Sequence, residues 1–190
     1  MARDGVYAKG RLKREEILDV ALEVFADEGY RGTSLRTIAA RCGLTVAGVM
    51  HYFDSREDLL TQVIFRRDQT GRPIHHDAPR TLAENLRGNA ERPGLVELFV
   101  SLTAAARDRK HPAHEVLAQR YAGLRVTLRE DVVARQEAGE LPAHLDPDAL
   151  ARLILATADG AQLQWMVDDE ATLAGPLDTL LYDVLGLARP

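Results

Sequence analysis

The residues best suited to recognise another molecule lie between Thr45 and Arg56, in the segment TVAGVMHYFDSR. A possible capping threonine is followed there by three small residues, Val46, Ala47 and Gly48. Small side chains at the start of a helix let its backbone come close to a surface, and their methyl groups can contact thymine methyls. The free N–H groups of a helix N-terminus attract phosphate. This spacing therefore favours contact with the bases and phosphates of duplex DNA.

Polar side chains near these small residues extend the predicted contact set. His51 and Tyr52 can reach a base or the sugar–phosphate edge, and Arg56 can bind a flanking phosphate. The predicted DNA-binding residues are Ser34, Arg36, Thr45, Val46, Ala47, Gly48, His51, Tyr52 and Arg56. Phe53 and Cys42, by contrast, are expected to pack in the core.

Residues that could support catalysis or bind a metal are scattered. The His-His-Asp run at 75–77 falls in one loop, and His111 and His114 flank Pro112 without a cysteine or a Glu-x-x-His pair. Zinc sites need more complete ligand sets than these. We find no nucleophile–base motif and no phosphate-binding glycine loop, so we expect no metal, no cofactor and no enzyme activity. Two alternatives to a DNA-binding protein stay open: an all-α enzyme, and a dimerisation module whose N-terminal domain no longer binds DNA.

The recognition segment must be held by short helices. Apolar residues recur with helical periodicity along the whole chain, and strand alternation is nearly absent. Helices are expected at about 11–28, 35–42, 46–52 and 56–69, with Gly29 and Gly43 ending the first two. Two short helices joined by a tight glycine turn form a helix-turn-helix, whose second helix enters the major groove.

Capping residues support these boundaries. Thr33 or Ser34 can cap the second helix and Thr45 the third, because their hydroxyl oxygens can accept free backbone N–H groups. Ser55 and Asp58 resemble a capping box at the start of the fourth helix.

The composition allows a packed core and gives no sign of membrane insertion. Of the 190 residues, 46% are apolar, but no run approaches the roughly 18 apolar residues of a membrane-spanning helix. The first residues lack the apolar core of a signal peptide, and the single cysteine fits a reducing cytoplasm. The net charge is −5, yet residues 1–56 hold nine basic and eight acidic residues. A near-neutral head on an acidic body suits a protein that meets phosphate only through its head.

Residues 33–60, TSLRTIAARCGLTVAGVMHYFDSREDLL, resemble the DNA-binding signature of the TetR family of bacterial transcriptional regulators. The matching residues are Thr33, Ile38, Ala39, Gly43, Thr45, Val49, Tyr52, Phe53, Ser55, Arg56, Glu57 and Leu59. The upstream segment ILDVALEVFADEGYRGTS is similar to the first helix of that family. One departure is Met50, which stands where the family usually has a phosphate-binding tyrosine and which cannot donate a hydrogen bond.

The resemblance implies an all-α fold of about nine helices in two domains. Residues 1–56 would form the DNA-binding head, and residues 57–190 a body that binds ligand and dimerises. It further implies a cytoplasmic homodimer, with no membrane partner, that represses transcription from a palindromic double-stranded DNA operator and is released by a small-molecule effector. The fourth helix would be the hinge between head and body.

The last two helices, expected at about 147–167 and 171–187, resemble the dimerisation helices of the family. A two-sided apolar helix near a C-terminus must bury one side in its own body and the other against a partner. The residues predicted for this interface are Leu150, Leu153, Ile154, Ala158, Ala161, Leu177, Leu181 and Val184. The alternative is the core of a monomeric bundle.

Further body helices are expected at about 81–91, 94–109 and 113–138. An effector pocket should be mainly apolar with a few polar groups. The residues predicted to line it are Phe99, Leu102, His114, Tyr121, Arg125, Gln162, Trp165 and Met166. The alternative is ordinary core packing for Phe99 and Leu102 and a solvated side chain for Arg125.

Overall fold

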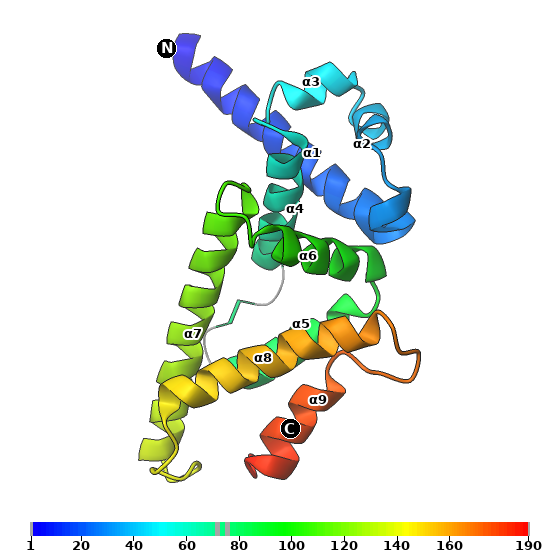
Figure 1. The fold of residues 1–190 in the computed structure, drawn as a ribbon. Helices are drawn as coiled ribbons and strands as arrows, with labels where there is room; N and C mark the ends of the chain where they lie inside the picture. Colours follow the sequence, from blue (N-terminus) through cyan, green and yellow to red (C-terminus); the bar gives the residue numbers. More distant parts are fainter. Residues whose placement is uncertain (1, 71–72, 75–76, 190) are drawn as a thin grey trace. The chain divides into compact units, whose positions relative to one another are not determined.

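The computed structural model describes residues 2–70, 73–74 and 77–189, and this part of the chain is all helical (Figure 1). In chain order the elements are α1 (Ala2–Gly32), α2 (Leu35–Arg41), α3 (Val46–Met50), α4 (Arg56–Thr70), α5 (Ala78–Asn89), α6 (Pro93–Ala105), α7 (Ala113–Glu137), α8 (Pro147–Trp165), α9 (Gly175–Asp178) and the π-helix η1 (Thr179–Val184). The predicted all-α class and the count of about nine helices are confirmed for the described residues.

The helices form two compact units, which we describe separately. The first contains residues 1–70 and 92–116, and therefore α1 to α4, α6 and the first turn of α7. The second contains residues 71–91 and 117–190, and therefore α5, most of α7 and the C-terminal helices. The predicted head of residues 1–56 is thus part of a larger unit, because α4 and α6 both pack against α1.

The core of the first unit is built on α1. One face of this helix is fully or almost fully buried and includes Ile17, Leu18, Ala21, Leu22, Val24 and Phe25. A bidentate ion pair fixes α4 beside it, since Arg66 donates to both carboxylate oxygens of Asp19 over 2.7 and 2.9 Å. This helix begins at Ala2, well before the predicted start near residue 11, because nothing between those positions interrupts the backbone hydrogen bonds.

A glycine pair sets how closely α6 approaches α1. The helical course of α1 is interrupted at Gly29, whose φ of 75° favours glycine, as the predicted helix end required. A Cβ added to Gly94, in the first turn of α6, would lie 2.1 Å from the carbonyl oxygen of Phe25 and 2.5 Å from Cα of Gly29. Both neighbours are backbone atoms that cannot rotate away, so only glycine fits at position 94.

An arginine cluster organises the second unit. The Arg135 guanidinium donates to Asp131 in its own helix, to Glu140 in the following loop and to Asp77 just before α5, over 2.6 to 2.8 Å. Asp131 in turn accepts the backbone N–H of Ala78 over 3.1 Å. These bonds fix the start of α5 against α7. Burial of the Arg135 guanidinium lowers its pKa, whereas the three neighbouring carboxylates raise it. The net result is a raised pKa for Arg135.

The C-terminal helix is shorter than predicted. The expected start near residue 171 is wrong, because the Thr172 hydroxyl accepts the N–H of Gly175 over 3.1 Å and the first helical turn begins there. The helix ends as η1 at Val184. Within the described residues, no helix combines the length and the apolar character needed to cross a bilayer.

Gly94→Ala is expected to lower the unfolding free energy by about 1–3 kcal/mol, because overpacking forces two helix backbones apart. Gly123→Ala in α7 is the matched control. Nothing lies within 4 Å of a Cβ at position 123, so alanine there should stabilise the helix by about 0.5–1 kcal/mol. Urea unfolding measures both changes, and equal effects at the two positions would contradict the close contact between α1 and α6.

Candidate nucleic-acid interface

The turn between α2 and α3 is closed by backbone hydrogen bonds. Gly43 has a φ of 64°, and the N–H of Leu44 reaches back to the carbonyl oxygen of Ala39 over 2.8 Å. This is the six-to-one bond of a Schellman motif, which ends a helix where glycine takes the left-handed conformation. The chain can therefore turn sharply and start α3 only a few residues later.

Both short helices have the predicted caps. The Ser34 hydroxyl oxygen accepts the N–H of Thr37 over 3.2 Å, and the Thr45 hydroxyl oxygen accepts the N–H of Gly48 over 3.0 Å. Thr33, the alternative cap, is buried and instead donates its hydroxyl to the carbonyl oxygen of Gly29 over 2.7 Å. Thr45 is the acceptor in its cap bond, so its hydroxyl keeps a proton that it can donate.

The third helix has one buried and one exposed side. Val49 is completely buried, and Phe53 just beyond the helix is 5% exposed. Val46 is 36% exposed, and Ala47 is also exposed. Gly48 lies between these two sides, and a Cβ there would meet only ordinary contacts. The N-terminal tip of α3 is therefore smooth, because Val49 points inward and the residues before it are small.

The remaining predicted DNA contacts lie on α2, just after α3 and at the start of α4. His51 is exposed and Tyr52 half-buried, and their rings meet edge to face with centroids 5.5 Å apart. Arg36 and Arg56 are exposed in the first turns of α2 and α4. Ser55 caps α4 as predicted, since its hydroxyl accepts the N–H of Asp58. The return bond differs by one residue from that of a capping box, because the Asp58 carboxylate accepts the N–H of Asp54.

This geometry is the helix-turn-helix arrangement, and comparison with known proteins identifies its family. The model of bacterial regulatory proteins of the tetR family matches residues 17–63, and the model of the C-terminal part of BetI-type transcriptional repressors matches residues 76–182. The chain belongs to the TetR family. It is a DNA-binding transcriptional regulator, and its C-terminal part is of the BetI-type repressor kind.

Individual TetR-family members resemble the chain over nearly its full length. The HTH-type transcriptional regulator UidR of Escherichia coli strain K12 is 25% identical over 201 residues, which cover 96% of this chain and 97% of UidR. A TetR regulator structure from Chloroflexus aurantiacus is 26% identical and covers 94% of both chains with a TM-score of 0.64. A regulator structure from Saccharomonospora viridis in complex with choline is 17% identical, covers 93% of this chain and 98% of its own, and has a TM-score of 0.68.

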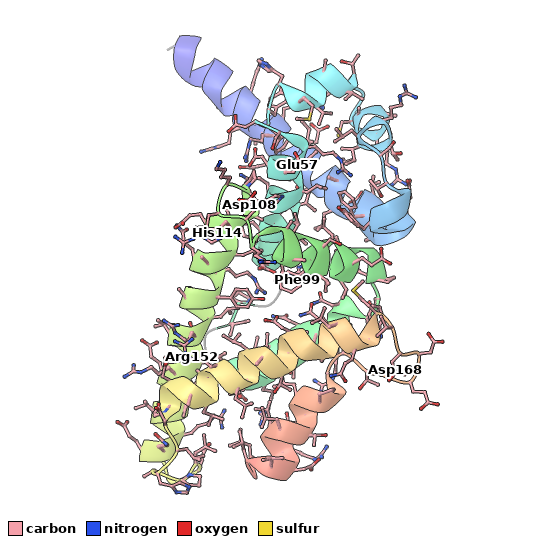
Figure 2. All side chains as sticks on the ribbon, viewed as in Figure 1. Glu57, Phe99, Asp108, His114, Arg152 and Asp168 are labelled. Atoms are coloured by element: carbon pink, nitrogen blue, oxygen red, sulfur yellow. The ribbon has the colours of Figure 1, made fainter. Side chains whose placement is uncertain are left out.

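The residues predicted to line an effector pocket are divided between the two units. Phe99 and Leu102 are buried in the first unit, where the guanidinium of Arg67 lies 5.1 Å from the centroid of the Phe99 ring. His114, labelled in Figure 2, places Nδ1 2.8 Å from the carbonyl oxygen of Ala106, at the junction of α6 and α7. In this unit the predicted residues therefore serve packing and the helix junction.

In the second unit the predicted pocket residues do not all gather in one place. Arg125 pairs with Asp148 near the start of α8 over 3.4 Å, whereas Trp165 ends the same helix. Asp148 and Trp165 are seventeen residues apart on α8, which corresponds to about 25 Å along the helix axis. Arg125 and Trp165 therefore cannot line one small pocket, and Met166, which is 38% exposed, lies at the Trp165 end.

A partly buried carboxylate that sequence reasoning missed connects α7 with the middle of α8. The Tyr121 hydroxyl donates to Asp159 over 2.8 Å, and Gln162, one turn further along α8, is buried. Desolvation raises the pKa of the Asp159 carboxyl, while the Tyr121 hydrogen bond and the charge of Arg120 oppose that rise. The available signal was an isolated acidic residue in the apolar run LILATADGAQL.

Among the described residues, no three His, Cys, Asp or Glu side chains are placed to share a metal ion. His75 and His76 lie outside the described residues.

Six of the eight residues predicted for the dimer interface are buried within the second unit. They are Leu150, Ile154, Ala158, Ala161, Leu177 and Leu181, and all are at most 6% exposed. Leu153 and Val184 are 50% and 69% exposed. On α8, the residues predicted from the periodicity therefore belong mostly to the stripe buried in the chain's own core. Periodicity alone does not separate the two cases, because core residues and interface residues have the same helical spacing.

Asp159→Asn is expected to change how stability depends on pH. A carboxyl whose pKa is higher in the folded than in the unfolded chain loses stability as pH rises from about 4 through its folded pKa. Asparagine still accepts the Tyr121 hydroxyl but does not ionise. Urea unfolding should therefore show the variant gaining stability relative to the parent protein between pH 4 and pH 7.

Asp169→Asn is the control, because Asp169 lies exposed in the loop after α8. A difference between Asp159→Asn and the parent protein that stays constant over this pH range would contradict the cost of burying Asp159.

Proposed function

We propose that α3 is the recognition helix and enters the major groove of an operator with its N-terminal end first. The observation that carries this proposal is the orientation of α3, with Val49 buried and Val46 and Ala47 exposed. Gly48 then lets the backbone approach the base edges, and the two exposed side chains can pack on thymine methyls. This orientation is the one in which a helix-turn-helix reads bases.

Contacts to the DNA backbone would fix the register of α3 on the duplex. Thr45 accepts from Gly48 and keeps its hydroxyl proton for a phosphate oxygen. Ser34 and Arg36 begin α2, Arg56 begins α4, and these side chains are suited to the phosphates on either side of the groove. His51 and Tyr52 follow the helix and would contact its far edge, where Met50 offers no hydrogen-bond donor.

Ala47→Leu is expected to weaken binding to the operator at least tenfold, because an isobutyl group at the tip of α3 would hold the backbone away from the base edges. Fluorescence anisotropy on a duplex selected from a random-sequence library measures the change. Ala104→Leu is the control, since Ala104 is an exposed alanine on α6 of the same unit.

Arg56→Ala should behave differently from Ala47→Leu. Loss of a phosphate contact weakens binding to all sequences alike and makes the salt dependence less steep.

Normal operator binding by Ala47→Leu would show that α3 does not read the bases.

We propose that the protein acts as a homodimer that pairs through the outer face of α8. Leu153, Ala156, Gly160, Leu163 and Val167 are spaced three and four residues apart on one stripe of this helix and its C-terminal extension. Leu153 is 50%, Leu163 54% and Val167 86% exposed. The small residues Ala156 and Gly160, between Leu153 and Leu163, would let two helices approach closely. A stripe with this spacing suits a second helix of the same kind, and a twofold axis would pair it with its own copy.

Leu163→Glu should shift the protein from dimer to monomer, because pairing across a twofold axis would bury two carboxylates side by side. Sedimentation velocity measures the assembly state. Leu12→Glu is the matched control, since Leu12 is 61% exposed on α1 of the other unit. A dimer that survives Leu163→Glu would contradict this interface.

We propose that a small effector binds in the body, in the part of the second unit around Tyr121, Asp159 and Gln162. These polar groups stand in a largely aliphatic region and offer both donors and acceptors. The Saccharomonospora viridis protein of the same fold is in complex with choline, which supports a small-molecule effector. A thermal-shift screen followed by release of bound operator would identify the effector.

The effector would act by favouring one spacing of the two recognition helices. Two α3 helices about one DNA turn apart can enter successive major grooves, and a different spacing cannot. A ligand shifts this balance only as far as its affinities for the two states differ. We also infer a cytoplasmic location, because the operator DNA is there.

A further inference from the structure

The N-terminal turns of α1 extend beyond the part of this helix that packs in the core. Figure 1 shows them projecting on the side of the first unit where α2 and α3 lie. The first 14 residues contain five basic residues and one acidic residue, in a chain whose net charge is −5. We propose that this segment is a second DNA-binding surface, which contacts backbone phosphates flanking the bases that α3 reads.

Two contacts attach this segment to the two ends of α3. The Lys13 ammonium donates to the carbonyl oxygen of Cys42 over 3.1 Å, in the turn that precedes Thr45. The Arg14 guanidinium lies 5.0 Å from the centroid of the Phe53 ring, three residues after Met50. Because both anchors are in the same unit as α3, the segment is held beside the recognition helix.

Lys9 and Arg11 extend this basic surface away from the anchors. Lys9 precedes Lys13 by four residues and Arg11 precedes Arg14 by three, so each lies on the same face as its anchor and about 5–6 Å further along the helix. Both are exposed, and the Arg11 side chain is 78% exposed. Long basic side chains at this distance from the ends of α3 can reach the phosphates that border the groove.

The acidic residues near this surface leave it positive. Glu16 is occupied by Lys13 over 2.7 Å. Glu15 lies 4.0 Å from Arg11, in a pair whose two side chains are 78% and 46% exposed, so solvent screens it strongly and a phosphate can replace it. Lys9 and Arg11 therefore remain available to a polyanion that α3 has already brought close.

The inference rests on the proposed placement of α3, and the experiment separates the two. The full-length protein is titrated with a duplex selected from a random library, at several salt concentrations. The variants are Lys9→Gln/Arg11→Gln, Arg56→Ala, and Arg129→Gln/Arg152→Gln. The last is the charge-matched control, because Arg129 and Arg152 are exposed and belong to the second unit.

Each phosphate contact contributes about 0.9 to the slope of log affinity against log salt. Lys9→Gln/Arg11→Gln should therefore lower the slope by about 1.8 per subunit and weaken binding more than tenfold at about 0.1 M salt. The preferred base sequence and the thermal midpoint should stay those of the parent protein, because these side chains are exposed and contact phosphate alone. The Arg129→Gln/Arg152→Gln control should keep the parent slope.

An unchanged slope for Lys9→Gln/Arg11→Gln, with a reduced slope for Arg56→Ala, would overturn the second surface and leave the recognition helix in place. An equal reduction in the charge-matched control would also overturn it, because the effect would then reflect net charge. A changed base preference would assign these residues to base reading and overturn the phosphate role. Parent protein that selects no duplex would overturn both proposals.

Discussion

A helix of five residues cannot hold its shape in water by its own hydrogen bonds, and α3 is such a helix. Its conformation depends on one buried side chain, Val49, and on Gly43 and the Thr45 cap, which set the turn before it and close its N-terminal end. The surface that we propose to bind DNA is therefore small, because the stabilising contacts are placed on the other side. Binding and stability do not compete for the same residues in this helix.

The same constraint explains why a larger core is needed beside α3. The third helix can be held only against a larger body, and the buried face of α1 supplies that body together with α4 and α6. Gly94 allows α6 to lie directly on the end of α1 at Gly29. The head predicted as residues 1–56 consequently folds as part of a unit that also includes α4 and α6. A hinge at Arg56, the start of α4, does not coincide with the boundary of this unit.

In the second unit, two groups of polar side chains lie at least partly inside with hydrogen-bond partners. Arg135 is surrounded by three carboxylates that connect α5, α7 and the following loop. Asp159 has the Tyr121 hydroxyl, yet burial still disfavours its charge. The Arg135 cluster holds the unit together, whereas ionisation of the Asp159 carboxyl lowers the stability of the fold. A ligand that satisfies such a group can repay part of this cost, which is why we place the effector there.

The sequence by itself determined the helix-turn-helix, its caps and the family, because local hydrogen bonds and turn glycines depend on residues close together in the chain. Ser34, Gly43, Thr45 and Ser55 all occupy the predicted roles. Only the tertiary structure decided which stripe of α8 is core, since buried and interface stripes share one helical period. It likewise separated Arg125 from Trp165 and joined Tyr121 to Asp159, because contacts between distant residues depend on how whole helices pack.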